Sequence, residues 1–204
     1  MPAATLFPSS LSLLKEQWGF LPCGFLALAG ESQARNRYTY AAAIARQEGF
    51  EHIASVFEET ARNEQEHARL FYAHLAPLAP SALEITAGYP IVAGGTLAQL
   101  KAAVEGENEE WAALYPEFAR IAREEGFPKV AITFELVAKV EKEHEERYAR
   151  LMKRVEDGSV FKREAKILWR CMECGHIHEG PAAPGACPVC AKGKAWFEPV
   201  AESF

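Results

Sequence analysis

Apolar residues recur every three or four positions through most of the chain between residues 20 and 157, which is the period of an amphipathic helix. This pattern predicts four long helical segments, and glycine or proline marks most of their ends. The segments cover residues 22–47, 51–75, 96–125 and 128–157. Pro116 lies inside the third segment, where its missing backbone N–H must kink or split the helix. The predicted fold class is therefore mainly α.

A stretch rich in proline and glycine separates the second predicted helix from the third. Residues 76–95 read APLAPSALEITAGYPIVAGG, which is too broken for a helix and too long for a hairpin between neighbouring helices. Two helices, a long crossover and two further helices is the connectivity of a ferritin-like four-helix bundle. We therefore expect such a bundle in residues 20–157, preceded by an N-terminal extension in residues 1–19.

The pattern changes after the fourth helix. Residues 158–166 are charged and are predicted to form a linker, and residues 167–204 contain no helical repeat. Four of the five cysteines fall here as two CxxC pairs, which are Cys171, Cys174, Cys187 and Cys190. Four thiolates in such pairs form a tetrahedral site for iron or zinc, and a module this small needs the metal in order to fold. Spacing does not separate the two metals, although Trp169, Trp196 and Phe197 suit an electron-transfer iron.

Each predicted helix places a glutamate in the middle of its apolar stripe. Positions seven apart nearly coincide on a helix, so a glutamate with apolar residues at such spacings is expected to point inward. The inward glutamates are Glu31, Glu64, Glu107 and Glu141, and one turn along lie His67, Glu110 and His144. Several unpaired carboxylates in one core are untenable unless cations compensate them. One glutamate from each of two helices and a Glu-x-x-His pair from each of the others is the ligand set of di-iron and di-manganese bundles.

The alternative for a single Glu-x-x-His pair is an ordinary solvated surface, because the chain contains 27 glutamates. The metal prediction depends on both pairs lying on apolar stripes together with two further inward glutamates. Tyr38 and Tyr115 lie near these stripes, where an aromatic residue is more often part of the core, and Arg37 is expected to face elsewhere. On the third helix, the stripe is expected to contain Leu100, Val104, Trp111, Leu114 and Phe118.

Composition and charge narrow the classes of partner. The chain has 204 residues, is 49% hydrophobic and 25% charged, and has a formal net charge of -6. This acidic balance argues against nucleic acid and against an anionic membrane surface. No stretch approaches the roughly 20 uninterrupted apolar residues of a membrane span, and the first residues do not resemble a secretory signal. We expect a cytoplasmic protein, in which paired cysteines bind metal rather than form disulfides.

The chain resembles the rubrerythrins, in which a ferritin-like di-iron domain precedes a rubredoxin domain. The resemblance covers about residues 24–204 and is carried by GESQARNRYTY from Gly30, EETARNEQEHA from Glu58, EGENEEWAALYPEFARIAREEGF from Glu105, VEKEHEERY from Val140, and WRCMECGHIHEG with CPVC near the end. It implies that the seven glutamates and histidines named above hold two iron ions, and that the four paired cysteines hold one. It also implies a cytoplasmic peroxide reductase that is usually dimeric and receives its electrons ultimately from NAD(P)H. The resemblance further implies that Glu110 and His67 exchange as ligands of one iron when the redox state changes.

The predicted function is reduction of hydrogen peroxide to water. Two ferrous ions can each give one electron, which matches the two electrons needed to cleave the O–O bond. Tyr38 is expected to donate a hydrogen bond to peroxide, and the four-cysteine iron to refill the site with electrons from a redox protein or an NAD(P)H-dependent reductase. Because the module follows the fourth helix, it is predicted to serve the partner subunit in a head-to-tail homodimer.

Two other classes of function fit the same residues. One is a ferroxidase or iron-storage protein whose cysteine module binds structural zinc. The other is a regulatory protein that senses metal or oxygen through the bundle. The remaining cysteine, Cys23, is predicted to be a buried and inert thiol near the start of the first helix.

Overall fold

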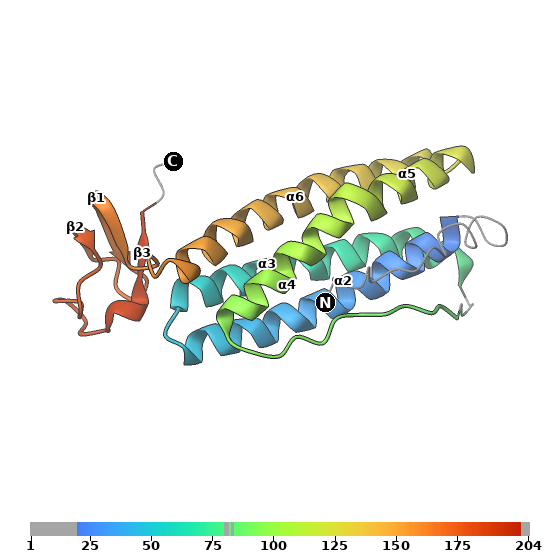
Figure 1. Ribbon diagram of the computed structural model, residues 1–204. Coiled ribbons are helices and arrows are strands. Elements are labelled where there is room, and N and C mark those ends of the chain that lie inside the picture. The colour runs from blue at the N-terminus through green and yellow to red at the C-terminus, as the bar shows by residue number, and fades with distance from the viewer. Residues whose placement is uncertain (1–19, 80–81, 83, 201–204) are drawn as a thin grey trace.

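Helices lying side by side form the larger part of the molecule (Figure 1). The computed structural model describes residues 20–79, 82 and 84–200, so the predicted N-terminal extension lies outside the described residues. Helix α2 spans Phe20–Gln47 and helix α3 spans Glu51–Leu75. The second predicted helix therefore has the observed bounds, and the first begins slightly earlier than predicted.

The third predicted helix consists of three consecutive pieces. Helix α4 spans Thr96–Glu109, a π-helical turn η2 spans Glu110–Leu114, and helix α5 spans Tyr115–Glu124. Pro116 lies in the first turn of α5, directly after the π-helical turn, and its missing N–H removes one backbone hydrogen bond from the continuous helix. The interruption expected at Pro116 thus takes the form of a widened turn just before it. Helix α6 spans Pro128–Glu156 and completes the bundle.

A long crossover joins the two helical hairpins. Helix α2 contacts α3 extensively, and α4 and α5 contact α6, so each hairpin is built from neighbours in the sequence. After the short 3-10 turn η1, Ala76–Leu78, residues 84–95 of the crossover run along the outside of the bundle to Thr96 (Figure 1). This is the connectivity of the ferritin-like fold that the sequence pattern predicts.

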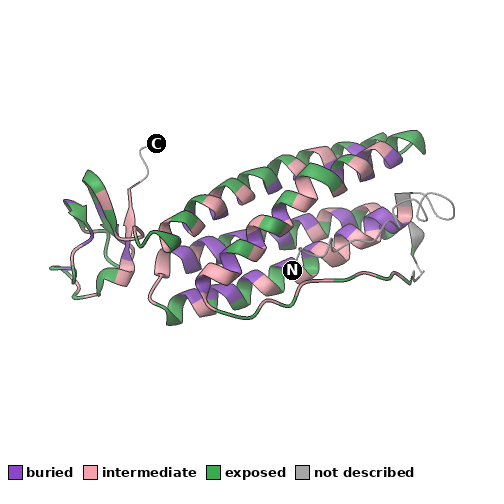
Figure 2. Cartoon of the chain, viewed as in Figure 1, coloured by how far each residue is buried: buried purple, intermediate pink, exposed green. Residues whose placement is uncertain are grey.

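Buried residues gather on the facing sides of the helices, as the colouring of Figure 2 shows. They form two apolar clusters, one around Phe57 and Tyr148 and the other around Phe71 and Phe134. Cys23 belongs to the second cluster and is fully buried, as predicted. Burial raises the pKa of its thiol to about 12, so the thiol stays protonated and unreactive.

A strand-rich module lies at one end of the bundle (Figure 1). Its three-stranded antiparallel sheet has the order β2-β1-β3, and the strands are β1 Lys162–Cys171, β2 Ile177–Ala182 and β3 Phe197–Pro199. The 3-10 turn η3, Lys194–Trp196, precedes β3. Residues 162–166, expected in a linker, are instead part of β1, because they continue the strand that carries Trp169. Trp169 and Phe197 are buried in the module core, whereas Trp196 is only half-buried.

The module contacts the turn between α2 and α3 of its own bundle. The ring of Phe161 stacks on that of Phe50 with 6.1 Å between the centroids. Nδ1 of His52 lies 2.9 Å from Oε2 of Glu198. These contacts place the cysteine module beyond the end of the bundle, next to the first turn of α3.

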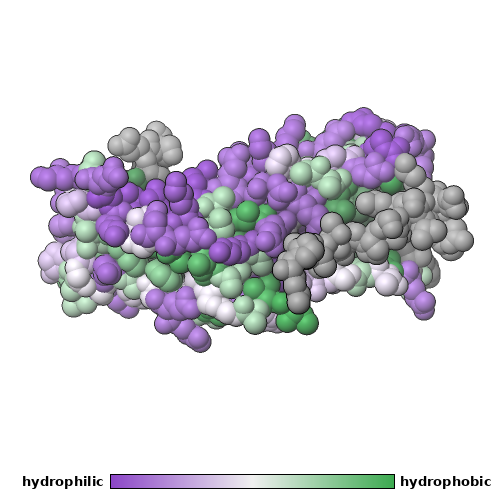
Figure 3. Space-filling model, viewed as in Figure 1, coloured by the Kyte–Doolittle hydropathy of each residue, from purple (hydrophilic) through white to green (hydrophobic). Residues whose placement is uncertain are grey.

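The outer surface is largely polar. On the face shown in Figure 3, hydrophilic residues cover the upper edge, where α5 and α6 lie, and apolar residues gather lower down. Among the described helices, none combines the length and the apolar character needed to cross a lipid bilayer.

Candidate metal centres

Four glutamates and two histidines converge from the helices between the two apolar clusters. All six side chains are at most 6% exposed. Their ligand atoms form two groups of four, and within each group the atoms lie within 4.8 Å of one another. The groups are Glu31, Glu64, His67 and Glu141, and Glu64, Glu107, Glu141 and His144. Two overlapping groups that share two carboxylates are the arrangement expected for two neighbouring cations.

The two shared glutamates each face both histidines. In Glu141, Oε1 lies 2.8 Å from Nδ1 of His67, and Oε2 lies 2.8 Å from Nδ1 of His144. In Glu64, Oε2 lies 2.9 Å from Nδ1 of His67, and Oε1 lies 3.3 Å from Nδ1 of His144. Each shared carboxylate therefore presents one oxygen to each half of the cluster.

Two buried tyrosines hold the unshared glutamates. Tyr38 donates its hydroxyl hydrogen to Oε1 of Glu107, and Tyr115 donates to Oε1 of Glu31. Burial raises the pKa of both tyrosines well above the ordinary value, so both hydroxyls remain donors. In each glutamate one oxygen is fixed by a tyrosine, and within the described structure the other, Oε2, has no hydrogen-bond partner.

Unsatisfied buried oxygens test whether metal ions fit this cluster. In the described part of the chain, Oε2 of Glu31 and Oε2 of Glu107 are buried without a hydrogen-bond partner, and the oxygens of Glu64 and Glu141 are paired with the two histidines. Leaving a buried polar group unsatisfied costs about 1–3 kcal/mol, and more for a charged group. Cations remove this cost by binding the free oxygens, and a mixture of carboxylate and imidazole ligands suits iron or manganese. The residues therefore fit two such ions.

Glu110 lies beside the cluster and belongs to neither group of four. It is the first residue of the π-helical turn, and a Cβ added to Gly30 would lie 3.9 Å from its Oε1. Burial and the charges of Glu141 and Glu110 raise the pKa of Glu31 well above the ordinary value. Of the seven predicted ligands in the bundle, Glu110 is thus the one that the structure places at the edge.

The π-helical turn η2 determines which side chains of the continuous α4–η2–α5 helix point toward the site. On a regular α-helix, residue 115 would lie about 80° around the axis from residue 107. A π turn contains one extra residue, which reduces this angle to about 20°. Tyr115 is accordingly 1% exposed, whereas Trp111 and Leu114, which were expected on the inward stripe, are only half-buried. The stripe prediction was therefore wrong at Trp111 and Leu114, because it assumed an unbroken α-helical period, whereas Phe118 is buried as predicted.

With no metal bound, the cluster retains protons at neutral pH. Burial opposes the charged form of the histidines, but hydrogen bonds to glutamates raise the pKa of His67 to about 10 and that of His144 to about 12. Burial, together with the charge of Glu64, raises the pKa of Glu107 to about 8. Burial also works against the ionisation of Glu64, yet its hydrogen bonds with both histidines lower its pKa to about 2.

Iron(II) binding to the metal-free protein is expected to strengthen as the pH rises. Raised pKa values mean that His67, His144 and Glu107 hold protons below about pH 8, and a metal must displace them. Each displaced proton adds about a tenfold gain in affinity per pH unit between about pH 6 and about pH 8. Anaerobic calorimetry in two buffers of different ionisation enthalpy measures the protons released. An affinity independent of pH would contradict this assignment of protons.

The second centre is the cluster of four cysteines in the module. Sγ of Cys171 lies 3.7 Å from Sγ of Cys190, and Sγ of Cys174 lies 3.6 Å from Sγ of Cys187. A tetrahedron with metal–sulfur bonds of about 2.3 Å has edges of about 3.8 Å. The predicted set of cysteines therefore has the spacing for a single metal ion.

Two equivalent turns present these thiols. The residue after each CxxC pair has a positive φ, 77° at Gly175 and 61° at Ala191. The N–H of Gly175 donates to the carbonyl of Cys171, and the N–H of Ala191 donates to that of Cys187, both at 2.9 Å. Burial opposes ionisation of Cys187, but backbone N–H groups of its own turn lower the pKa of the thiol to about 7. A thiolate is therefore accessible for metal binding near neutral pH.

Known proteins share this two-part organisation. The rubrerythrin family model matches residues 25–152, and the model of the rubrerythrin rubredoxin-like domain matches residues 169–198. Rubrerythrin of Porphyromonas gingivalis is 51% identical over 180 residues, covering 88% of each chain. Rubrerythrin-1 of Clostridium acetobutylicum is 48% identical over 180 residues, covering 87% of this chain and 92% of that one. A solved structure of nigerythrin in the fully reduced, all-ferrous state is 32% identical with a TM-score of 0.62, covering 89% of this chain and 87% of that chain.

The comparisons agree with the chemistry of both centres. The buried glutamates and histidines form a di-iron carboxylate site, and the four cysteines form a rubredoxin-like iron site, as the sequence predicts. The ferritin-like bundle and the small module have the order along the chain that both family models require. The chain therefore belongs to the rubrerythrin family of iron-binding oxidoreductases.

Proposed function

We propose that the protein reduces hydrogen peroxide to water at the di-iron site. The observation that supports this most directly is the pair of overlapping ligand groups in a buried cluster. When bound, two ferrous ions supply the two electrons that, with two protons, convert one peroxide molecule into two waters. Electrons would return through the four-cysteine iron from a redox protein or an NAD(P)H-dependent reductase.

We assign the ligands of the proposed reaction residue by residue. Glu64 and Glu141 would each serve as a ligand to both ions, because each faces both histidines. Glu110 would alternate with His67 as a ligand of one ion, as the family resemblance implies. The full sets are Glu31, Glu64, His67, Glu107, Glu110, Glu141 and His144 for the di-iron site, and Cys171, Cys174, Cys187 and Cys190 for the single iron.

Tyr38 and Tyr115 act as positioning residues in this proposal. Tyr38 was expected to donate a hydrogen bond to peroxide, but its single hydroxyl hydrogen is donated to Glu107. Tyr115 donates in the same way to Glu31. Each tyrosine would keep one of these two carboxylates turned toward the metal positions, and both tyrosines are themselves buried.

We propose that the cysteine module delivers electrons to a partner subunit in a head-to-tail homodimer. In its own chain the module contacts Phe50 at the α2–α3 turn, which is about 20 Å along α3 from Glu64 at 1.5 Å per residue. Direct electron transfer slows steeply with distance, so a bundle in a second subunit is the better acceptor. A row of exposed apolar residues one turn apart on α6 offers contact area, namely Ile132, Leu136 and Val140. Free thiolates require reducing surroundings, and we therefore propose a cytoplasmic location.

A peroxide titration of the fully reduced holoprotein tests the proposed function. One equivalent of hydrogen peroxide is expected to oxidise the di-iron site completely, and faster than dissolved dioxygen does. A ferroxidase or storage protein would instead prefer dioxygen and retain added iron well beyond the three ions of the two centres. The visible spectrum shows whether the cysteine module holds iron or zinc, because a ferric four-cysteine site is red and a zinc site is colourless.

A further inference from the structure

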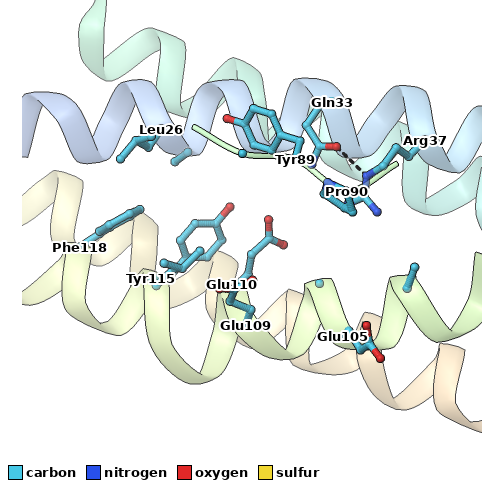
Figure 4. Close-up of a pocket in the computed structure, with 16 residues that line it drawn as sticks. Leu26, Gln33, Arg37, Tyr89, Pro90, Glu105, Glu109, Glu110, Tyr115 and Phe118 are labelled. Carbon is cyan, nitrogen blue, oxygen red and sulfur yellow. Dashed lines mark hydrogen bonds between the residues drawn. The ribbon is translucent and has the colours of Figure 1, made fainter. Parts of the chain in front are cut away.

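A cavity lies beside the di-iron site, between α2, the crossover and the junction of α4 with η2 (Figure 4). Its volume is about 80 Å³. A single water needs about 10–15 Å³ of such space, so the cavity has room for a small molecule. Glu110 and Tyr115 both line it, and Tyr115 also donates to Glu31 of the metal cluster. The cavity and the site therefore share a wall.

The walls are largely apolar, and three of their polar groups are placed to bind a small molecule. The hydroxyl of Tyr89, in the crossover, is buried and has no hydrogen-bond partner among the described residues. The guanidinium of Arg37, expected to face elsewhere, lines the cavity and is oriented by a 2.6 Å hydrogen bond from its Nε to Gln33. The carboxylate of Glu110 reaches from η2 toward the crossover (Figure 4). The apolar lining includes Leu26, Leu114 and Phe118.

We propose that this cavity is an access site in which hydrogen peroxide binds between Tyr89 and Glu110 before it reaches the irons. The proposal rests on the proposed function and adds a binding site to it. Peroxide is neutral, small, and both a donor and an acceptor of hydrogen bonds, which matches a hydroxyl, a guanidinium and a carboxylate in apolar surroundings. The further carboxylates of Glu105 and Glu109 in the lining disfavour an anion at the same place.

The passage from the cavity to the irons follows Glu110. A Cβ at Gly30 would lie 3.9 Å from Oε1 of this glutamate, so a glycine there leaves the space around the carboxylate open. Peroxide bound near Tyr89 then has the Glu110 carboxylate between it and the metal cluster. A ligand that sits at the edge of its site, next to a cavity, is well placed to give way to an incoming molecule.

Two variants of the reduced holoprotein test the access site by stopped-flow spectroscopy. Tyr89→Phe keeps the ring and removes the free hydroxyl, so the second-order rate constant for oxidation by hydrogen peroxide should fall about threefold to tenfold, the value of one hydrogen bond. Ala102→Leu fills the cavity from α4, so it should slow peroxide and nitric oxide alike. Nitric oxide binding to the reduced irons reports passage without turnover, and Tyr89→Phe should leave its rate unchanged.

Matched controls come from the surface of the bundle. Tyr72 on α3 and Ala43 on α2 are exposed, so Tyr72→Phe and Ala43→Leu should leave both rate constants unchanged. Melting temperatures check folding, and Tyr89→Phe alone decides the question if Ala102→Leu does not fold. Peroxide rate constants within twofold of the unmodified protein in both variants would overturn the proposal. So would an Ala102→Leu protein that takes up iron(II) slowly but reacts with peroxide at the normal rate, because the cavity would then be a metal route.

Failure of the access site and failure of the proposed function give different results. If the unmodified reduced protein reacts no faster with peroxide than with dioxygen, the proposed function is wrong. If the unmodified protein prefers peroxide and Tyr89→Phe does not change that rate, only the access site is wrong.

Discussion

Replacing Cys171 and Cys174 with alanine is expected to reduce steady-state peroxide turnover to the background rate while the first oxidation stays normal. The double variant loses half of the sulfur ligands, so the module cannot hold its iron. The di-iron ligands all lie on helices between the two apolar clusters, away from the module. Peroxide should therefore still oxidise the pre-reduced bundle once, and re-reduction should fail.

Stopped-flow oxidation and an NAD(P)H-linked steady-state assay measure these two steps separately. Cys23→Ala is the matched control, because that thiol lies in a bundle cluster and stays protonated. Normal turnover in the double variant would show that the module does not relay electrons. Loss of the first oxidation would show that the module is needed to assemble the bundle site.

Replacing Glu141 with alanine is expected to remove both ions of the di-iron site. Its two oxygens lie 2.8 Å from Nδ1 of His67 and from Nδ1 of His144, and the side chain is fully buried. Its loss takes a ligand from both groups of four and leaves two histidines without their shared partner. Iron content should fall from three ions per chain to the single ion of the cysteine module.

Elemental analysis gives this count, and the red colour of the ferric module serves as an internal standard. Glu143→Ala on the same helix faces solvent and should retain all three ions. A Glu141→Ala protein that keeps three ions and reacts normally with peroxide would exclude the position assigned to this glutamate.

The sequence predicted the helices, and the burial of the candidate ligands, well where local periodicity determines the outcome. Helix α3 has the predicted bounds, and Glu64 is buried as expected, because an amphipathic period fixes which face of a regular helix turns inward. The same reasoning predicted that Glu31 and Glu141 point inward, and both are fully buried. Paired cysteines were equally informative, since metal binding fixes their local geometry.

The prediction failed where local geometry departs from a regular helix or where distant segments meet. The π-helical turn brought Tyr115 inward in place of Trp111, and periodicity assumes that no such turn exists. The cavity depends on the crossover lying against α2, which brings Tyr89 and Arg37 into the lining of one cavity. The spacing of residues within one segment cannot predict how that segment packs against another. A proline shortly after a run of candidate ligands, as at Pro116, was the available signal for the widened turn.

Anomalous scattering at the iron edge from crystals of the holoprotein tests most directly whether the buried carboxylates exist to hold two irons. Two peaks about 3.5–4 Å apart are expected in the cluster, with Glu64 and Glu141 between them, and a third within the four cysteines. An interior without peaks, with these glutamates turned toward solvent or paired only with the histidines, would contradict the di-iron site and the proposed reaction with it.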